Sequence, residues 1–240
     1  MMSLEDNIQG HPPAYDDEPS KELWEPTILV LAGTTIHAES ADTAPLYRLS
    51  RAVAHITVAT KEVEFKRVER TVNTKADELV IVPRSRHIYT LFCLGKGNGW
   101  VLPRVFIKSE SRRTMGHLGI KRSHLFVNKD LTVIPIDLSN NRPTLPSEMG
   151  PPFLIQRGKD GKDVWKDRDG KVLAVEDWSD KSHKLIITTS LHRETIDALV
   201  ALWCGRIWQN SEENAEPLYK GLDAGMSLLS QGLAFATDMP

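Results

Sequence analysis

The stretch TIDALVALWCGRIW, residues 195–208, decides the fold of this 240-residue chain. From Ile196 to Trp208 only Asp197 and Arg206 are charged. Apolar residues fall on every side of the helix that their spacing predicts, and a helix that is apolar all round must be enclosed by other elements. The stretch therefore predicts a helix over 192–208 that lies inside a domain.

The residues before this helix have the pattern of short strands separated by turns. Gly, Pro, Asn or Asp occupy the turns, and two Asp-Gly pairs predict tight hairpins because they supply the positive φ angles that such turns need. So many strands followed by one enclosed helix predict a mainly β fold, a closed β-barrel wrapped around a buried apolar helix near the C-terminus. The predicted strands are Ile28–Leu31, His55–Ala59, Glu62–Val68, Leu79–Val82, Ile88–Leu94, Trp100–Ile107, Leu125–Val127, Leu131–Ile136, Phe153–Gln156, Asp163–Lys166, Lys171–Glu176 and Lys184–Thr189.

Composition divides the chain into three parts. Residues 1–26 are rich in Pro, Ser and acidic side chains and predict a disordered acidic tail, followed by the barrel domain over 27–208. Residues 209–240 form an acidic C-terminal extension, in which apolar residues at helical spacing, interrupted by glycines, predict a weak docked helix. The net charge is only −2, so the domain between the two acidic ends is basic. This asymmetry bears on partners rather than on the fold.

The sequence predicts neither a signal peptide nor a membrane span. The first residues lack an apolar core segment, and the apolar run of the helix is shorter than the roughly 20 residues that a bilayer requires. Cys93 and Cys204 lie in apolar stretches and predict buried free thiols rather than a disulfide framework. We expect a soluble protein of the cytoplasm, with the nucleus or the surface of a membrane as alternative locations.

Four segments resemble the tubby C-terminal-like superfamily, in particular LURP-one-related and phospholipid-scramblase-like proteins. They are APLYRLSRAV (44–53), HIYTLFCL (87–94), DVWKDRDGKVLAVED (163–177) and LIITTSLHRETIDALVALWCGRIW (185–208). The resemblance implies the same closed barrel around a buried helix. It also implies a binding module, since tubby domains bind membrane phosphoinositides through basic residues. The segments do not align those residues with positions here, and this chain departs from the family by continuing past the helix.

The sequence contains no recognised catalytic or metal motif, and no cofactor is expected. The string GKGNGW (95–100) precedes a predicted strand rather than a helix, so it does not predict a phosphate-binding loop. Trp165–Glu176 has the acidic spacing of a calcium loop but begins with tryptophan at the first ligand position. His117 and His124 lack the spacing of a metal pair. Because a triad assembled from distant residues leaves no motif, an enzyme with a ligand cavity in the barrel is the alternative interpretation.

A basic stretch over 104–124 is the candidate binding surface. An ordinary solvated strand and loop would have the same composition. The functional interpretation is an anion-binding face for a phospholipid headgroup. Nucleic acid is the less favoured ligand, because the stretch lacks exposed aromatic residues on which bases stack. The candidate residues are Arg104, Lys108, Arg112, Arg113, Lys121 and Arg122, and Glu110 is the only acidic residue among them.

The string Pro12-Pro13-Ala14-Tyr15 lies in the predicted tail. WW domains bind Pro-Pro-x-Tyr segments because the prolines pre-set polyproline II geometry. Pro12, Pro13 and Tyr15 are therefore a candidate ligand for a WW-domain protein. The sequence as a whole predicts a non-enzymatic binding module with a partner-recruiting tail, and it gives no indication of the oligomeric state.

Overall fold

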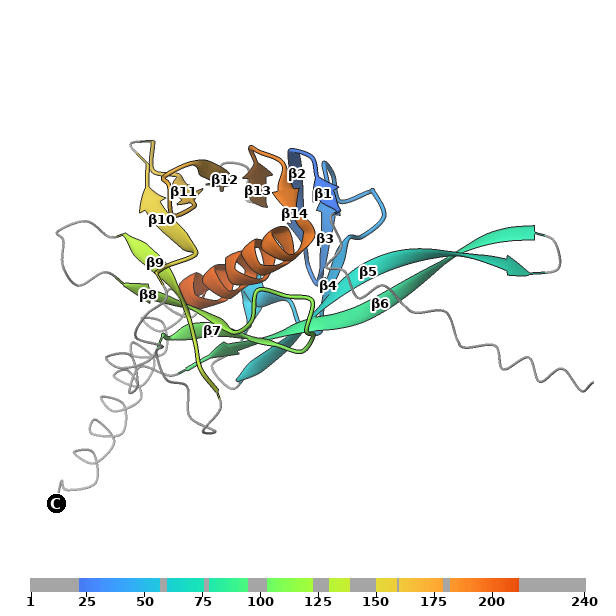
Figure 1. Cartoon of the computed structure of the whole chain (residues 1–240), viewed down its shortest axis with the longest axis horizontal. Coiled ribbons are helices and arrows are strands. Elements are labelled where there is room, and N and C mark those ends of the chain that lie inside the picture. Colours follow the sequence, from blue (N-terminus) through green and yellow to red (C-terminus); the bar gives the residue numbers. More distant parts are fainter. Residues whose placement is uncertain are drawn as a thin grey trace, which may run out of the picture.

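A computed structural model describes residues 22–56, 60–75, 78–94, 103–122, 130–138, 150–158, 160–178 and 182–211. It is mainly β, with strands arranged around one helix, α1, at residues 193–211 (Figure 1). The strands are β1 (Leu23–Trp24), β2 (Thr27–Ala32), β3 (Thr35–Ala38), β4 (Tyr47–Leu49), β5 (Glu62–Lys75), β6 (Glu78–Cys93), β7 (Val105–Ser109), β8 (Leu118–Arg122), β9 (Leu131–Pro135), β10 (Phe153–Arg157), β11 (Asp163–Lys166), β12 (Val172–Asp177), β13 (His183–Ile187) and β14 (Leu191–His192).

Among the described residues, twelve strands close into one barrel, in the order β10-β11-β12-β13-β2-β3-β4-β5-β6-β7-β8-β9. Pairing is antiparallel throughout, and the pair of β9 with β10, with Val133 opposite Phe153, completes the circle. Strands that follow one another in the barrel also follow one another in the chain, except where β13 pairs with β2. The barrel is therefore an up-and-down arrangement whose two ends meet beside each other.

Helix α1 fills the interior of this barrel. Every residue from Ile196 to Trp208 is buried, and Trp203 is among the largest fully buried side chains. The helix shares one apolar core with inward-facing strand residues such as Leu29 and Phe65. The predicted closed barrel around a buried C-terminal helix is therefore confirmed, and the helix continues to residue 211, three residues beyond its predicted end.

Gly205 allows α1 to lie directly against β7. A Cβ atom added at this position would lie 2.5 Å from Cγ1 of Val105, far inside the ordinary contact distance of about 3.5–4.0 Å. Val105 is itself fully buried. A glycine weakens an isolated helix, so its place in the middle of α1 is explained by the close approach of the barrel wall.

A two-stranded sheet of β1 and β14 lies next to the start of α1. Trp24 pairs with Leu191, and the Arg193 guanidinium lies 4.6 Å from the centre of the Trp24 ring. The predicted tail over 1–26 is therefore too long at its C-terminal end, because Leu23–Trp24 are held against the helix. The predicted docked helix beyond residue 211 lies outside the described residues.

Two strand predictions need correction. The predicted strand at His55–Ala59 is wrong at its start, because Val53–His55 is a 3-10 turn that buries Val53 in the core. The predicted strands Leu79–Val82 and Ile88–Leu94 belong to the single long strand β6. Strands β3, β4 and β8 were not predicted, since each offers only two or three apolar residues to a pattern.

Strands β5 and β6 extend beyond the barrel. They pair with each other along their whole length, whereas β4 pairs only with Phe65–Arg67 of β5 and β7 only with Tyr89–Cys93 of β6. We call residues 68–75 and 78–86 the arm. Figure 1 shows the arm projecting away from the barrel as a twisted two-stranded ribbon. Within the described part of the chain, no helix is both long enough and apolar enough to cross a membrane.

Candidate functional site

Two adjoining cavities lie at the end of the barrel where α1 begins. Their volumes are about 360 Å³ and about 620 Å³, and they share Met115, Pro152 and Arg168. The smaller cavity is also lined by Phe153, Leu173, Leu191, Thr195 and residues of the turn 167–171. The larger is also lined by His117, Leu118, Pro135, Ile136, Asp137 and Glu194. Both linings are largely apolar, and the polar groups come mainly from two loops and the first turn of α1.

The turn between β11 and β12 forms one side of this opening. The Asp167 carboxylate accepts hydrogen bonds from the backbone N–H groups of Asp169 at 3.0 Å and Lys171 at 2.9 Å. Gly170 has a φ of 82°, which favours glycine. The predicted Asp-Gly hairpin is confirmed by the pairing of β11 with β12. The acidic residues that imitate a calcium loop therefore shape a turn.

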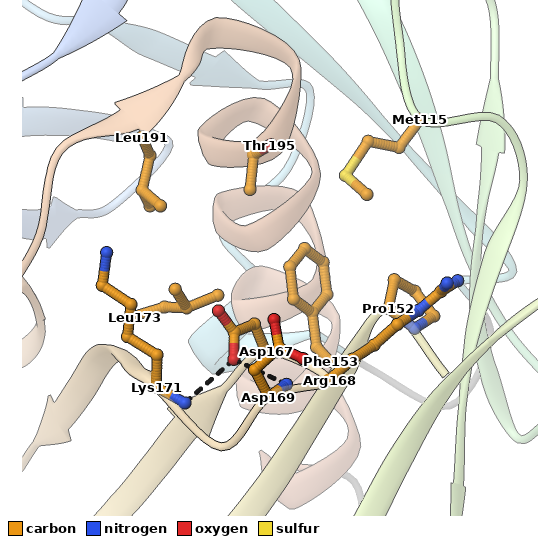
Figure 2. Close-up of a pocket in the computed structure, with 10 residues that line it drawn as sticks. All are labelled: Met115, Pro152, Phe153, Asp167, Arg168, Asp169, Lys171, Leu173, Leu191 and Thr195. Atoms are coloured by element: carbon orange, nitrogen blue, oxygen red, sulfur yellow. Dashed lines mark hydrogen bonds between the residues drawn. The ribbon is translucent and has the colours of Figure 1, made fainter. Parts of the chain in front are cut away.

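Arg168 lies at the tip of this turn, between the two cavities. Its Nε donates a hydrogen bond to the Pro151 carbonyl oxygen at 3.1 Å, and its Nη2 donates to the Gly150 carbonyl oxygen at 2.9 Å. In Figure 2 the Arg168 side chain extends toward Pro152, while Lys171 extends along the opposite side of the cavity. The Nη1 group of Arg168 makes no hydrogen bond within the described residues. Two hydrogen bonds therefore hold Arg168 between the cavities.

The loop between β7 and β8, residues 110–117, forms the opposite side of the opening. The hydroxyl groups of Ser109 and Thr114 lie 2.6 Å apart. The Met115 backbone N–H donates to the buried Tyr89 hydroxyl at 3.2 Å. Burial raises the pKa of that hydroxyl, so it stays protonated. These bonds fix the loop, and Met115 lines both cavities.

His117 ends this loop and lines the larger cavity. Its Nδ1 accepts a hydrogen bond from the Ser109 backbone N–H at 2.9 Å, which requires a neutral ring with its proton on Nε2. Burial, and then the positive charge of Lys108, lower the pKa of His117. The ring is therefore neutral at pH 7 and offers one N–H donor.

The structure divides the six predicted basic residues between the two ends of the β7–β8 hairpin. At the loop end, Arg112 and Arg113 are exposed, and Lys108 pairs with Glu110 at 3.2 Å. The second group lies roughly 13 Å away along the strands, where Val105 pairs with Ile120. Neither group lines the cavities, but Arg112 and Arg113 belong to the loop whose Met115, Gly116 and His117 do. The second group consists of Arg104, Lys121 and Arg122.

The rim of the opening is mixed in charge. The exposed carboxylates among the residues that line the cavities are Asp137, Asp169 and Glu194. Arg168 and Lys171 line the smaller cavity, and the exposed Arg112 and Arg113 belong to the loop that carries Met115 and His117. Arg168 and Lys171 are not among the residues predicted from the sequence, because a basic residue in a hairpin turn is ordinary on any protein surface. Their placement across the cavity from Met115 of the β7–β8 loop follows only from the closed barrel.

A buried ion cluster holds the start of α1. Asp197 accepts a hydrogen bond from the Tyr47 hydroxyl at 2.8 Å and from Nη1 of Arg67 at 2.6 Å, and Nε of Arg193 lies 3.7 Å away. Burial raises the pKa of Asp197, although both arginines act in the opposite direction. Asp197 is predicted from the sequence only as an isolated charge in an apolar run, and its partners are far away in the chain.

A second buried cluster holds the other end of α1. Arg206 pairs with Asp163, and its Nε lies 3.0 Å from Oε1 of Glu176. The Trp165 indole N–H donates to the same carboxylate oxygen at 2.8 Å. Burial raises the pKa of Glu176 to about 7, and the negative charge of Asp163 adds to the rise, whereas Arg206 and the Trp165 hydrogen bond oppose it. None of these residues lines the two cavities, so their role is to position the helix.

The described residues contain no group of His, Cys, Asp or Glu side chains that could hold a metal ion. Both cysteines are buried, and burial raises the pKa of Cys204. The lining of the two cavities therefore offers hydrogen bonds, charge and apolar contact. The candidate WW ligand Pro12, Pro13 and Tyr15 lies outside the described residues, as does His124.

Comparison of the chain with protein-family models, with curated proteins and with solved structures gave no match. The resemblance to the tubby C-terminal-like superfamily therefore stays a prediction from four sequence segments. What can be said about function rests on the geometry at the opening of the barrel.

Proposed function

We propose that this chain is a non-enzymatic binding module that takes up an anionic phospholipid from a membrane surface at the opening of its barrel. The observation that best supports the proposal is the meeting of two apolar cavities at Arg168. Its Nη1 group has no hydrogen-bond partner among the residues that the structure describes, and exposed Arg112 and Arg113 belong to the loop across the opening.

The cavities suit the apolar part of such a ligand. Their volumes of about 360 and 620 Å³ lie in the range of roughly 300–1,000 Å³ that is usual for small-molecule sites. Met115, Phe153 and Leu173 supply apolar surface. Each methylene group of an acyl chain that leaves water for such a surface contributes about 0.8 kcal/mol.

The rim suits the headgroup. A basic residue near an anionic membrane contributes about 1 kcal/mol, so Arg168 at the cavities and Arg112 and Arg113 on the neighbouring loop would all attract the phosphate of a headgroup. The exposed carboxylates of Asp137, Asp169 and Glu194 complement an ammonium group. An anionic phospholipid that also carries an amine, the class of phosphatidylserine, therefore fits this rim better than phosphatidylglycerol does.

Co-sedimentation with vesicles tests the proposal. The full chain is mixed, at low and at physiological salt, with vesicles of phosphatidylcholine alone or with added phosphatidylserine or phosphatidylglycerol. We expect binding to anionic vesicles that is strongest with phosphatidylserine and weakens as salt screens the charges. A chain that ignores anionic vesicles at low salt would refute the proposal.

Two double variants locate the surface. Arg112→Glu with Arg113→Glu should weaken vesicle binding by about tenfold or more. The matched control, Lys121→Glu with Arg122→Glu at the far end of the same hairpin, should have little effect. Both should keep the free energy of unfolding within about 1 kcal/mol of the wild type, as surface substitutions usually do. Equal loss in both would indicate a diffuse basic surface instead of the opening.

The enzyme alternative is tested with the same vesicles. After prolonged incubation the phospholipid should be recovered unchanged by mass spectrometry. A new lipid species that forms only in the presence of the folded chain would show that the opening is an active site, and the binding-module proposal would then be wrong.

A further inference from the structure

The arm of β5 and β6 has no neighbour among the described strands beyond the barrel. A two-stranded ribbon is only marginally stable by itself in water. Arg70 and Thr71 are exposed, and Ile81 and Val82 are 62% and 41% exposed, so the arm also presents apolar side chains to solvent. Such an arm gains stability when another strand joins one of its edges.

One hydrogen bond shows which backbone groups point to each edge. The Val68 N–H donates to the Leu46 carbonyl oxygen at 2.8 Å, away from β6. Successive residues of a strand direct their N–H and C=O groups to alternate sides. The groups of Arg70, Val72 and Thr74 therefore also point away from β6, toward the free edge of β5.

The two edges of the arm are unequal. Pro83 pairs with Arg70, so by the same alternation it occupies an outward-directed position on the free edge of β6. Proline has no N–H group and interrupts a ladder at such an edge. Strand β5 has no proline between Arg70 and Lys75. The edge of β6 is therefore blocked, and the edge of β5 is open.

We propose that the open edge of β5 pairs with the same edge of a second copy of this chain, around a two-fold axis at Val72. Antiparallel pairing about this axis places Val72 opposite Val72 of the second copy, and Arg70 opposite Thr74. Every outward-directed group of this segment then meets an outward-directed group of the other copy. The contact is isologous, so it closes as a dimer and does not propagate into a fibre.

The sequence of the arm favours this register. Glu69 lies opposite Lys75 of the second copy on both sides of the axis, and opposite charges in such positions stabilise a sheet. Val72 pairs with Ile81 within each copy, so the register places these two positions of both copies in one line across the joined sheet of four strands. An axis at Thr71 or Asn73 would also join outward-directed groups, but it would lose the charge pairs, so the charges favour the axis at Val72.

Sedimentation of the full chain as a function of concentration tests the proposal. Val72→Pro removes the central outward N–H without removing a bond between β5 and β6. Ser85→Pro is the matched control, because Ser85 pairs with Val68 and so lies on the blocked edge. We expect a reversible wild-type dimer, a dissociation constant raised about tenfold or more by Val72→Pro, and little change with Ser85→Pro.

Two results would overturn the proposal. One is a wild-type chain that stays monomeric at about 100 µM, a concentration that detects micromolar association. The other is equal weakening by both prolines, which would show that any association does not use the edge of β5. Circular dichroism and thermal unfolding check that each variant keeps its barrel, so loss of dimer is distinguished from loss of fold.

Disulfide formation between two variants tests the register itself. The axis at Val72 places Thr71 opposite Asn73 of the second copy in a non-hydrogen-bonded pair, with a Cα separation of about 4.5 Å that a disulfide can span. A mixture of Thr71→Cys and Asn73→Cys chains should form a covalent dimer under mild oxidation faster than either variant alone. Equal rates in the mixture and in the single variants would refute this axis.

Discussion

Replacing Gly205 by alanine would set one methyl group against the wall of the barrel. The new Cβ would lie 2.5 Å from Cγ1 of Val105, about 1 Å closer than ordinary carbon contact. Helix α1 has little freedom to move away, because Asp197 near its start and Arg206 near its end are both bound to the barrel. The substitution therefore creates an overlap that the side chains must absorb.

Two effects of opposite sign set the size of the change. Alanine favours a helix over glycine by about 1 kcal/mol, and an extra methyl group in a packed core costs about 1–3 kcal/mol. We expect Gly205→Ala to lower the free energy of unfolding by about 1 kcal/mol. Val105→Ala removes two methyl groups from a fully buried residue and should lower it by about 2 kcal/mol.

The double variant is the decisive measurement. In it the methyl group at position 205 occupies space that Val105 has left, so the two changes should together cost about 1–2 kcal/mol less than their sum. Urea denaturation of the four proteins, followed by tryptophan fluorescence, gives this coupling energy. Val63→Ala serves as the control partner, because within 4 Å the added methyl would contact only Val105. A coupling with Val105 that is within about 0.5 kcal/mol of zero would refute the explanation of Gly205.

Three further predictions follow from the core, the second ion cluster and the N-terminal tail. Leu199→Asp should prevent folding, because an unpaired charge in the core costs several kcal/mol, and a soluble variant that unfolds cooperatively would contradict the enclosure of α1. The pKa of Glu176 is raised from 4.5 to about 7, so the folded state holds this proton more tightly than the unfolded chain. Its contribution to stability is then complete below pH 4.5 and is lost as the pH rises through about 7, and Glu176→Gln should flatten that fall in the free energy of unfolding. An unchanged pH dependence in Glu176→Gln would show that another group is responsible. A peptide of residues 10–20 should bind a WW domain with micromolar affinity and lose that binding with Tyr15→Ala, whereas equal binding of both peptides would end the hypothesis.

The sequence was sufficient for the fold class because the decisive signals are local. An apolar stretch that is long enough for a helix and has no polar face must be buried inside a domain. The Asp-Gly turn at Asp169-Gly170 likewise specifies its hairpin within a few residues. The long pairing of β5 with β6 was not predicted. The arm has little alternation of apolar and polar residues, so the sequence predicted two separate short strands where β6 is continuous.

The site was predictable only in part, because it is assembled from distant segments. Arg112 and Arg113 stand out in a basic stretch, whereas Arg168 lines both cavities from a turn more than fifty residues later in the chain. Asp197 is bonded to Tyr47, 150 residues away in the chain, and to Arg67, 130 residues away. No local sequence pattern identifies partners at such separations. A buried charge needs a partner, so the sequence indicates that such partners exist without identifying them.

The position of α1 in the chain has a consequence for biosynthesis. Strands β2 to β13 are all synthesised before the helix that fills the barrel. The strand that begins at Thr27 can therefore complete its packing only after residue 211, the end of α1, has been synthesised. At about 5–20 residues per second this delay is roughly ten to forty seconds. During that time the inward-facing side chains have no core to join and the sheet has open edges, which are the features that favour aggregation. The nascent chain is therefore expected to depend on chaperones until the final helix emerges and the barrel closes around it.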